Sequence, residues 1–311
     1  MLRGALLYFS EQPTLRRLFS GPLARPLVRR FVAGDDLNEA MEVVRRLNAA
    51  GMLATLDYLG EAVTNAAEAS AAALQYIAIL HAIERQKARS TASLKLTQMG
   101  LDIDRALCVR NVKRILVQAE QFGNFIRIDM ESSKYTQVTL DIFKELFAQH
   151  QNVGVVIQAY LYRSEADIRE LNAMGARVRL CKGAYNEPPS VAFPQKADTD
   201  ANFIKLMRLL LSEGTYPAIA THDERMIEAT REYAARHGIT PDRFEFQMLY
   251  GIRRDLQARL VREGYRLRIY VPYGRQWYPY LMRRLAERPA NLLFVLGGIL
   301  RERRGHGPVV S

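Results

Sequence analysis

Cysteine and tryptophan are scarce in this chain, which has two cysteines and one tryptophan in 311 residues. Cys108 and Cys181 give neither a disulfide framework nor the spacing of a metal site. The five histidines are scattered, without an HExxH or comparable ligand pair. No apolar run approaches the ~18 uninterrupted residues of a transmembrane helix. The sequence therefore argues against a zinc enzyme, predicts no metal, and fits a reducing cytoplasm.

Acidic residues are also too few to balance the charge. The chain has 33 Asp and Glu against 44 Lys and Arg, a net charge of +11. Residues 16–46 and 252–304 are the more basic regions. Nucleic acid could be the partner, but no recognised binding motif accompanies the charge, and we expect none. An anionic membrane surface is the other candidate, so peripheral attachment to the inner face of the membrane stays open.

The first 34 residues are rich in arginine, with Glu11 as their one acid, as in a mitochondrial transit peptide. They continue, however, into a capped amphipathic helix over residues 35–50, with Asp35 or Asp36 as its N-cap and Gly51 as its stop. This continuity favours N-terminal helices that belong to the folded protein over a transit peptide.

Short β-rich runs alternate strictly with helical patterns along the rest of the chain. The runs are Met52–Tyr58, Ala92–Thr97, Phe125–Met130, Val153–Tyr160, Arg177–Lys182, Pro217–Thr221, Arg243–Leu249 and Leu267–Val271. The helical patterns cover residues 62–88, 104–122, 137–149, 164–174, 197–213, 223–237, 252–263 and 278–288. Such alternation predicts parallel strands joined by crossover helices.

Eight βα units over about 240 residues match a closed (β/α)8 barrel of the TIM type. An open doubly wound sheet usually carries a GxGxxG turn after its first strand, and the sequence has none there. We therefore predict N-terminal helices packing on the barrel over residues 1–50, the barrel itself over 51–300, and a flexible tail over 301–311.

Polar side chains gather where the predicted strands end, which is where barrels of this type place their active sites. They are Asp57 and Glu61, Lys95, Asp129 and Glu131, Gln158 and Tyr160, Arg179 and Lys182, Thr221 and His222, Gln247, and Tyr270. Each has a structural alternative: Lys95 with Asp129 could form a buried ion pair, and His222 could cap the next helix. Together, their excess of positive groups favours an anionic substrate or cofactor.

An adjacent pair of arginines follows the last predicted strand. On the helix that begins near Tyr278, residues Tyr280, Arg283, Arg284 and Glu287 share one face, at spacings of three and four. Two guanidinium groups near a strand end suit a carboxylate, which they grip through bidentate hydrogen bonds. The alternative is a solvated helix face with an Arg–Glu pair.

These segments resemble the proline dehydrogenases, flavin enzymes that oxidise proline to Δ1-pyrroline-5-carboxylate, in their single-function bacterial form. The similar segments are Asp57-Tyr-Leu-Gly-Glu61, Ser93-Leu-Lys-Leu96, Ile128-Asp-Met-Glu131, Arg179-Leu-Cys-Lys-Gly-Ala-Tyr185, Ala220-Thr-His222, Phe246-Gln-Met-Leu-Tyr-Gly251, Arg268-Ile-Tyr-Val-Pro-Tyr-Gly274 and Tyr280-Leu-Met-Arg-Arg284. They follow the family's order, and the resemblance spans residues 57–291.

The resemblance implies a role for each group around the substrate. Arg283 and Arg284 would hold the carboxylate of proline, with Lys95 as a third positive contact. The ring would be walled by Leu249, Tyr270 and Tyr280. Asp129 and Arg179 are the implied catalytic residues: Asp129 would orient Lys95 and border the flavin, and Arg179 would donate towards flavin N5. Glu61 paired with Arg283 would form a gate.

The implied cofactor is FAD. Met130, Gln158, Arg179, Lys182, Gly183 and Ala184 would bind its ring system, and Lys196, Thr221, His222 and Gln247 would reach its ribityl, diphosphate or adenosine parts. Asn186 departs from the family, because many relatives carry an aromatic residue there, and this leaves the adenine contacts open.

The expected function is therefore oxidation of L-proline by hydride transfer to flavin N5, with the electrons passed to a membrane quinone, as the first step of proline catabolism. One alternative is a barrel flavoenzyme acting on hydroxyproline or another secondary amino acid, although Tyr280 favours proline. Another is a non-catalytic basic barrel that binds nucleic acid.

Overall fold

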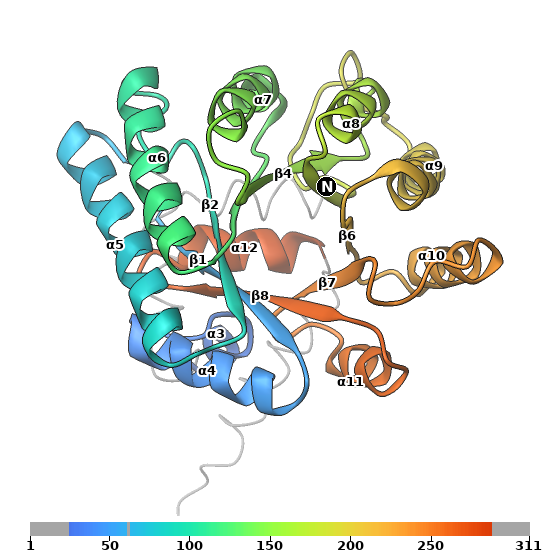
Figure 1. Ribbon diagram of the computed structural model, residues 1–311, viewed down its shortest axis with the longest axis horizontal. Coiled ribbons are helices and arrows are strands. Elements are labelled where there is room, and N and C mark those ends of the chain that lie inside the picture. Colours follow the sequence, from blue (N-terminus) through green and yellow to red (C-terminus); the bar gives the residue numbers. More distant parts are fainter. Residues whose placement is uncertain (1–24, 61–62, 288–311) are drawn as a thin grey trace, which may run out of the picture.

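The computed structural model describes residues 25–60 and 63–287, and its strands form a closed, all-parallel barrel in sequence order (Figure 1). The strands are β1 (Leu53–Tyr58), β2 (Ser90–Leu94), β3 (Ile126–Ile128), β4 (Val153–Gln158), β5 (Arg177–Cys181), β6 (Ala218–Ala220), β7 (Glu245–Leu249) and β8 (Leu267–Tyr273). Pairing of β1 with β8, from Leu53 opposite Arg268 to Tyr58 opposite Tyr273, closes the barrel. The predicted barrel fold is confirmed.

A helix follows each strand, and most of these helices form a ring outside the barrel (Figure 1). They are α5 (Ala66–Arg85), α6 (Arg105–Gln121), α7 (Ser133–Phe147), α8 (Ser164–Ala173), α9 (Lys196–Glu213), α10 (Glu224–Arg236), α11 (Arg254–Arg262) and α12 (Tyr278–Glu287). Within the described residues, two helices precede β1: α3 (Arg25–Phe31) and α4 (Leu37–Ala49). The predicted tail, residues 301–311, lies outside the described residues.

The ends of α4 follow the sequence signals. Asp36 is the N-cap, and its side chain accepts hydrogen bonds from the backbone N–H groups of Asn38 and Glu39. The helix ends before Gly51, which has a φ of 82°.

Other boundaries differ from the predicted ones for local reasons. The second strand ends at Leu94 rather than Thr97, because the chain turns there and Met99 N donates to the carbonyls of Lys95 and Leu96. The last strand continues through Pro272 to Tyr273, two residues beyond the predicted end at Val271. The segment after α3 supports this extension, since Ala33 N donates to the Pro272 carbonyl over 2.9 Å.

The barrel interior is polar, where branched apolar residues are usual. Contacts between strands that are not neighbours cross it: Arg179 Nη2 (β5) donates to Ser93 Oγ (β2) over 3.0 Å. Nearer the amino ends of the strands, Arg268 donates to both carboxylate oxygens of Glu245, over 2.8 and 3.0 Å. The apolar core lies instead between the strands and the helices, where Tyr76 of α5 is fully buried.

A second apolar cluster joins α3 to α12. Val28, Phe31 and Val32 belong to it, together with Leu59, Ile252, Tyr278, Tyr280, Leu281 and Met282, and Leu249 packs against it. Helix α3 therefore forms part of the surface against which α12, the helix with the arginine pair, packs.

Among the described helices, α5 is long and apolar enough to cross a membrane. Its residues Tyr76, Ile79 and Leu80 are fully buried within the main core of the barrel. The apolar composition of α5 is therefore explained by its packing in the core.

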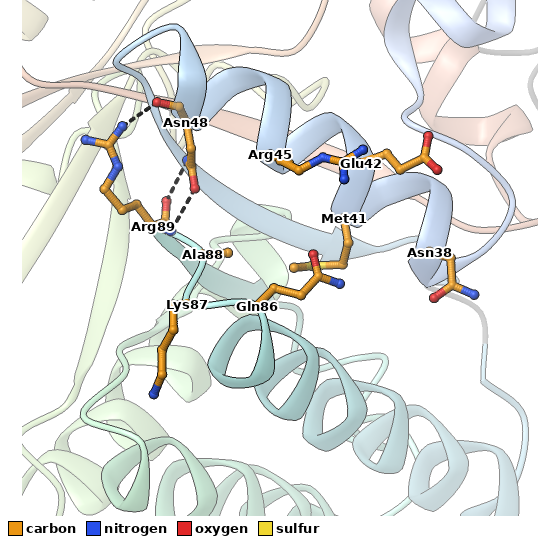
Figure 2. A pocket seen from close by; sticks show the side chains of 9 residues that line it. All are labelled: Asn38, Met41, Glu42, Arg45, Asn48, Gln86, Lys87, Ala88 and Arg89. Carbon is orange, nitrogen blue, oxygen red and sulfur yellow. Dashed lines mark hydrogen bonds between the residues drawn. The ribbon is translucent and has the colours of Figure 1, made fainter.

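A groove of about 770 Å³ lies between α4 and the turn that leads into β2, at the amino ends of the strands (Figure 2). There the side chain of Asn48 bonds the backbone of Arg89, and the Arg89 guanidinium bonds the Asn48 carbonyl. The groove is thus at the opposite end of the barrel from the carboxyl ends of the strands.

Gly251 allows the close contact between α3 and the loop after β7. Its φ is 77°, and a Cβ built there would lie 1.7 Å from the Arg30 carbonyl oxygen. Gly264 has a similar φ of 83°, with nothing within 4 Å of such a Cβ. We expect Gly264→Ala to lower the free energy of unfolding by about 1 kcal/mol, the cost of the left-handed backbone.

We expect Gly251→Ala to lower the free energy of unfolding by about 3 kcal/mol, because the added methyl group must also displace α3. Urea denaturation of the two variants measures the difference. Equal losses of unfolding free energy in the two variants would show that the contact between α3 and this loop does not stabilise the fold.

Candidate active site

Asp129, Arg179 and Tyr270 form the centre of the site at the carboxyl ends of the strands. Asp129 directly follows β3, and its carboxylate accepts from Arg179 Nη1 and from Tyr270 Oη, both over 2.7 Å. The Arg179 guanidinium lies 5.5 Å from the centroid of the Tyr270 ring. Strands β3, β5 and β8 are therefore joined through one buried carboxylate.

The Tyr270 hydroxyl is held in its protonated form. Burial, and then the negative charges of Asp129 and Asp57, raise the pKa of Tyr270 well above its ordinary value. Tyr270 therefore remains a neutral donor to Asp129 over the whole physiological pH range.

Lys95 has a different partner from the one we expected. The expectation that Asp129 orients Lys95 is wrong: Asp129 is turned to Arg179 and Tyr270, while Lys95 Nζ lies 3.2 Å from each carboxylate oxygen of Asp57. Asp57 is fully buried at the end of β1. Sequence reasoning noted Asp57 within a motif and gave it no role, although its place one strand from Lys95 was available as a signal.

The expected substrate residues converge from β7, β8 and α12. Tyr280 is buried, and the half-buried Arg284 places its guanidinium 5.4 Å from the centroid of the Tyr280 ring. Leu249 packs against the same cluster as Tyr280. Arg283 lies in α12, but its side chain is outside the described residues, as is the whole of Glu61, so the predicted gate is not placed.

Oε1 of Gln158 and Nε of Arg179 are buried polar atoms at this rim, and neither has a hydrogen-bond partner among the described residues. The other end of the Gln158 amide is fixed, since its Nε2 donates to the carbonyls of Met130 and Glu131 over 3.4 and 3.2 Å. A buried unpaired polar atom is costly, so this acceptor and this donor suit a bound polar group.

Gly183 brings the backbone close to an aromatic ring in the loop after β5. Its φ is 109°, and a Cβ there would lie 2.4 Å from the Tyr160 ring. The loop continues into Ala184, a small and half-buried residue. The resulting backbone course requires glycine at position 183.

A cluster of charged side chains lies beyond the ends of β5 and β6. Lys182 Nζ is 2.5 Å from Asp200 and 2.9 Å from Asp223, and Arg225 Nη2 is 3.0 and 3.1 Å from the same two carboxylates. Lys196 bonds Asp200. Burial alone would raise the pKa of Asp223, but hydrogen bonds from Arg225 and Lys182 outweigh it and hold that pKa well below its ordinary value.

The remaining predicted cofactor residues fall in two places. Thr221 and His222 lie beside the charged cluster: Thr221 Oγ1 accepts from Asp223 N over 3.1 Å, and His222 Nε2 accepts from Leu249 N over 2.9 Å. Gln247 lies deeper in the barrel, where its Nε2 donates to Glu245.

Sequence reasoning did not identify Asp200, Asp223 and Arg225 as members of this cluster. For Asp200, the available signal was its spacing of four residues from Lys196, at the start of the predicted helical pattern over residues 197–213.

Comparison with known proteins decides the family. The family model described as proline dehydrogenase matches residues 40–296. Proline dehydrogenase 1 of Bacillus subtilis (strain 168) is 45% identical over 302 residues, which cover 97% of this chain and 100% of the relative. The chain belongs to the proline dehydrogenase family. The resemblance inferred from the sequence motifs is confirmed.

Other members agree in sequence and in fold. Proline dehydrogenase of Deinococcus radiodurans is 41% identical over 306 residues, covering 97% of this chain and 98% of the relative. The crystal structure of proline utilization A (PutA) from Bdellovibrio bacteriovorus superposes with a TM-score of 0.79 at 27% identity. That match covers 84% of this chain and 32% of the PutA chain, so this chain corresponds to about a third of that larger family member.

The buried position of Asp129 makes its charge important for stability. We expect Asp129→Asn to lower the free energy of unfolding by about 3 kcal/mol, because the variant leaves the Arg179 charge without its counter-charge. The exposed pair of Arg236 and Glu232 is a control, and Glu232→Gln should cost less than about 0.5 kcal/mol. Both are measured by urea denaturation of the apoprotein. A loss for Asp129→Asn as small as the control's would contradict a structural role for the Asp129–Arg179 pair.

Proposed function

We propose that this protein is an FAD-dependent enzyme that oxidises L-proline to Δ1-pyrroline-5-carboxylate and passes the electrons to a quinone. Membership of the proline dehydrogenase family supports the enzyme identity and the substrate. The observation that supports the proposal is the Asp129–Arg179–Tyr270 centre at the carboxyl ends of the strands. Leu249 lies opposite Tyr270 in the sheet and packs against the apolar cluster that contains Tyr280.

The substrate's carboxylate is assigned to the positive groups of this rim. Arg284 and Arg283 grip it from α12, and Lys95 contacts it from the end of β2. Stacking of Arg284 on Tyr280 limits the orientations of the guanidinium, so less freedom is lost on binding. Leu249, Tyr270 and Tyr280 then wall the apolar ring. Catalysis on this account depends chiefly on holding proline in one orientation.

The donor and acceptor groups present fit a flavin. Oε1 of Gln158 can accept from the imide of an isoalloxazine ring, and Nε of Arg179 can donate to a ring nitrogen or oxygen. FAD would supply the acceptor for the two electrons lost by proline. The role of Arg179 is to present positive charge where the ring becomes electron-rich, and Asp129 keeps the guanidinium in that orientation.

The charged cluster beyond β5 and β6 fits the diphosphate. Lys182, Lys196 and Arg225 outnumber the carboxylates of Asp200 and Asp223, which leaves a local excess of positive charge. The two carboxylates fix the directions of the cations before the cofactor binds. Thr221 and His222, at the end of β6, border the same region.

We also propose a location and an electron acceptor. The protein would lie in the cytoplasm, docked peripherally on the inner face of the membrane, where a quinone is within reach. The net charge of +11 supports this placement, since basic surfaces are attracted to anionic lipid.

Arg284→Met tests the substrate assignment. We expect the KM for L-proline to rise about 10- to 100-fold, the effect of losing a charge-assisted hydrogen bond, while the bound flavin per chain stays unchanged. Arg236→Met, on the exposed face of α10, is the control and should leave KM unchanged. Loss of flavin without a change in KM would assign Arg284 to the cofactor instead.

Membrane docking is tested with liposomes. Binding to vesicles that contain anionic lipid should weaken steeply as salt rises, because the attraction is screened within a Debye length of ~10 Å at 0.1 M salt. Vesicles of neutral lipid are the control. Binding that is absent, or that does not respond to salt, would contradict electrostatic docking.

A further inference from the structure

Asp57 makes a buried contact that none of the assigned roles uses. Both of its carboxylate oxygens lie 3.2 Å from Lys95 Nζ. The Asp57 side chain is fully buried and that of Lys95 is 11% exposed, so the pair is shielded from bulk water. In such surroundings the geometry of a charged pair is well defined.

The Asp57 carboxylate is itself held from the helix layer. Tyr76 of α5 places its hydroxyl 3.4 Å from Asp57 Oδ1 and 3.1 Å from Gln98 Oε1. Gln98 is fixed in turn, because its Nε2 donates to the Tyr58 carbonyl over 2.9 Å. A connected set of polar groups therefore runs from α5 to the ammonium of Lys95.

We propose, resting on the proposed function, that Asp57 is a positioning residue that holds the Lys95 ammonium towards the substrate's carboxylate. The Lys95 ammonium has three N–H donors. Pairing with both carboxylate oxygens of Asp57 restricts the long Lys95 side chain to one direction. A buried ammonium without its counter-charge would be costly.

A competing effect has the opposite sign. If the negative charge of Asp57 merely repelled the substrate's carboxylate, its removal would tighten binding. If Asp57 positions Lys95, its removal weakens binding through Lys95 alone. The two effects therefore change the affinity in opposite directions, and affinity measurements separate them.

The test is a double-mutant cycle of Asp57→Asn and Lys95→Met in the FAD-loaded protein. Calorimetry measures the binding of cyclopentanecarboxylate, which has the ring and the carboxylate of the substrate but no nitrogen. We expect Asp57→Asn to weaken binding at least tenfold, and to raise the KM for L-proline similarly while kcat changes less than threefold. In the Lys95→Met background, Asp57→Asn should change the affinity less than twofold.

Equal losses of affinity in both backgrounds, or tighter binding in Asp57→Asn, would overturn the proposal. If Lys95→Met binds normally, Lys95 does not contact the carboxylate and the proposal fails, while proline oxidation stands. Absence of proline oxidation and of probe binding in the unaltered protein would instead defeat the proposed function itself.

Tyr76→Phe covers the case in which Asp57→Asn does not fold. It removes only the hydroxyl that fixes Asp57, so we expect a two- to fivefold loss of affinity for cyclopentanecarboxylate that disappears in the Lys95→Met background. A loss that persists there would show a general effect on the fold and overturn the proposal.

Discussion

The contact on which the site depends is the buried carboxylate of Asp129, which accepts from Arg179 and Tyr270 across the barrel. Burying a guanidinium and a carboxylate is costly unless each finds a partner, and the two meet over 2.7 Å here. This pairing links three strands and sets the direction of the Arg179 guanidinium. Among the described residues, Arg179 Nε and Gln158 Oε1 have no hydrogen-bond partner, so this rim offers one donor and one acceptor to a polar ligand.

The same arrangement, a cation paired with a carboxylate, recurs at three positive groups of the site. Arg179 has Asp129, Lys95 has Asp57, and Lys182 has both Asp200 and Asp223. Each cation is thus held in place by the fold before any anion arrives. Preorganisation of this kind reduces the entropy lost on binding. The paired carboxylates also weaken the positive potential that attracts an anionic ligand. The Arg284 guanidinium lies over the ring of Tyr280, which belongs to the apolar cluster that α3 shares with α12.

Much of the fold could be predicted because strict alternation of strands and helices predicts a parallel sheet, and eight such units without a GxGxxG turn favour a closed barrel over an open sheet. The motifs at the strand ends identified the family. The pairing of charges could not. Asp57 and Asp129 both end strands beside Lys95, and only the three-dimensional course of the chain decides that Asp129 reaches across to Arg179. The strand through Pro272 was missed for a similar reason, since its support comes from Ala33, far away in the sequence.

The central claim is that this rim brings proline against a flavin. An anaerobic absorption spectrum of the FAD-loaded protein, recorded before and after addition of L-proline, tests it most directly. We expect proline to bleach the visible flavin band, and hydroxyproline at the same concentration to bleach it less. A flavin band that L-proline leaves unchanged would show that this rim does not present proline to a flavin.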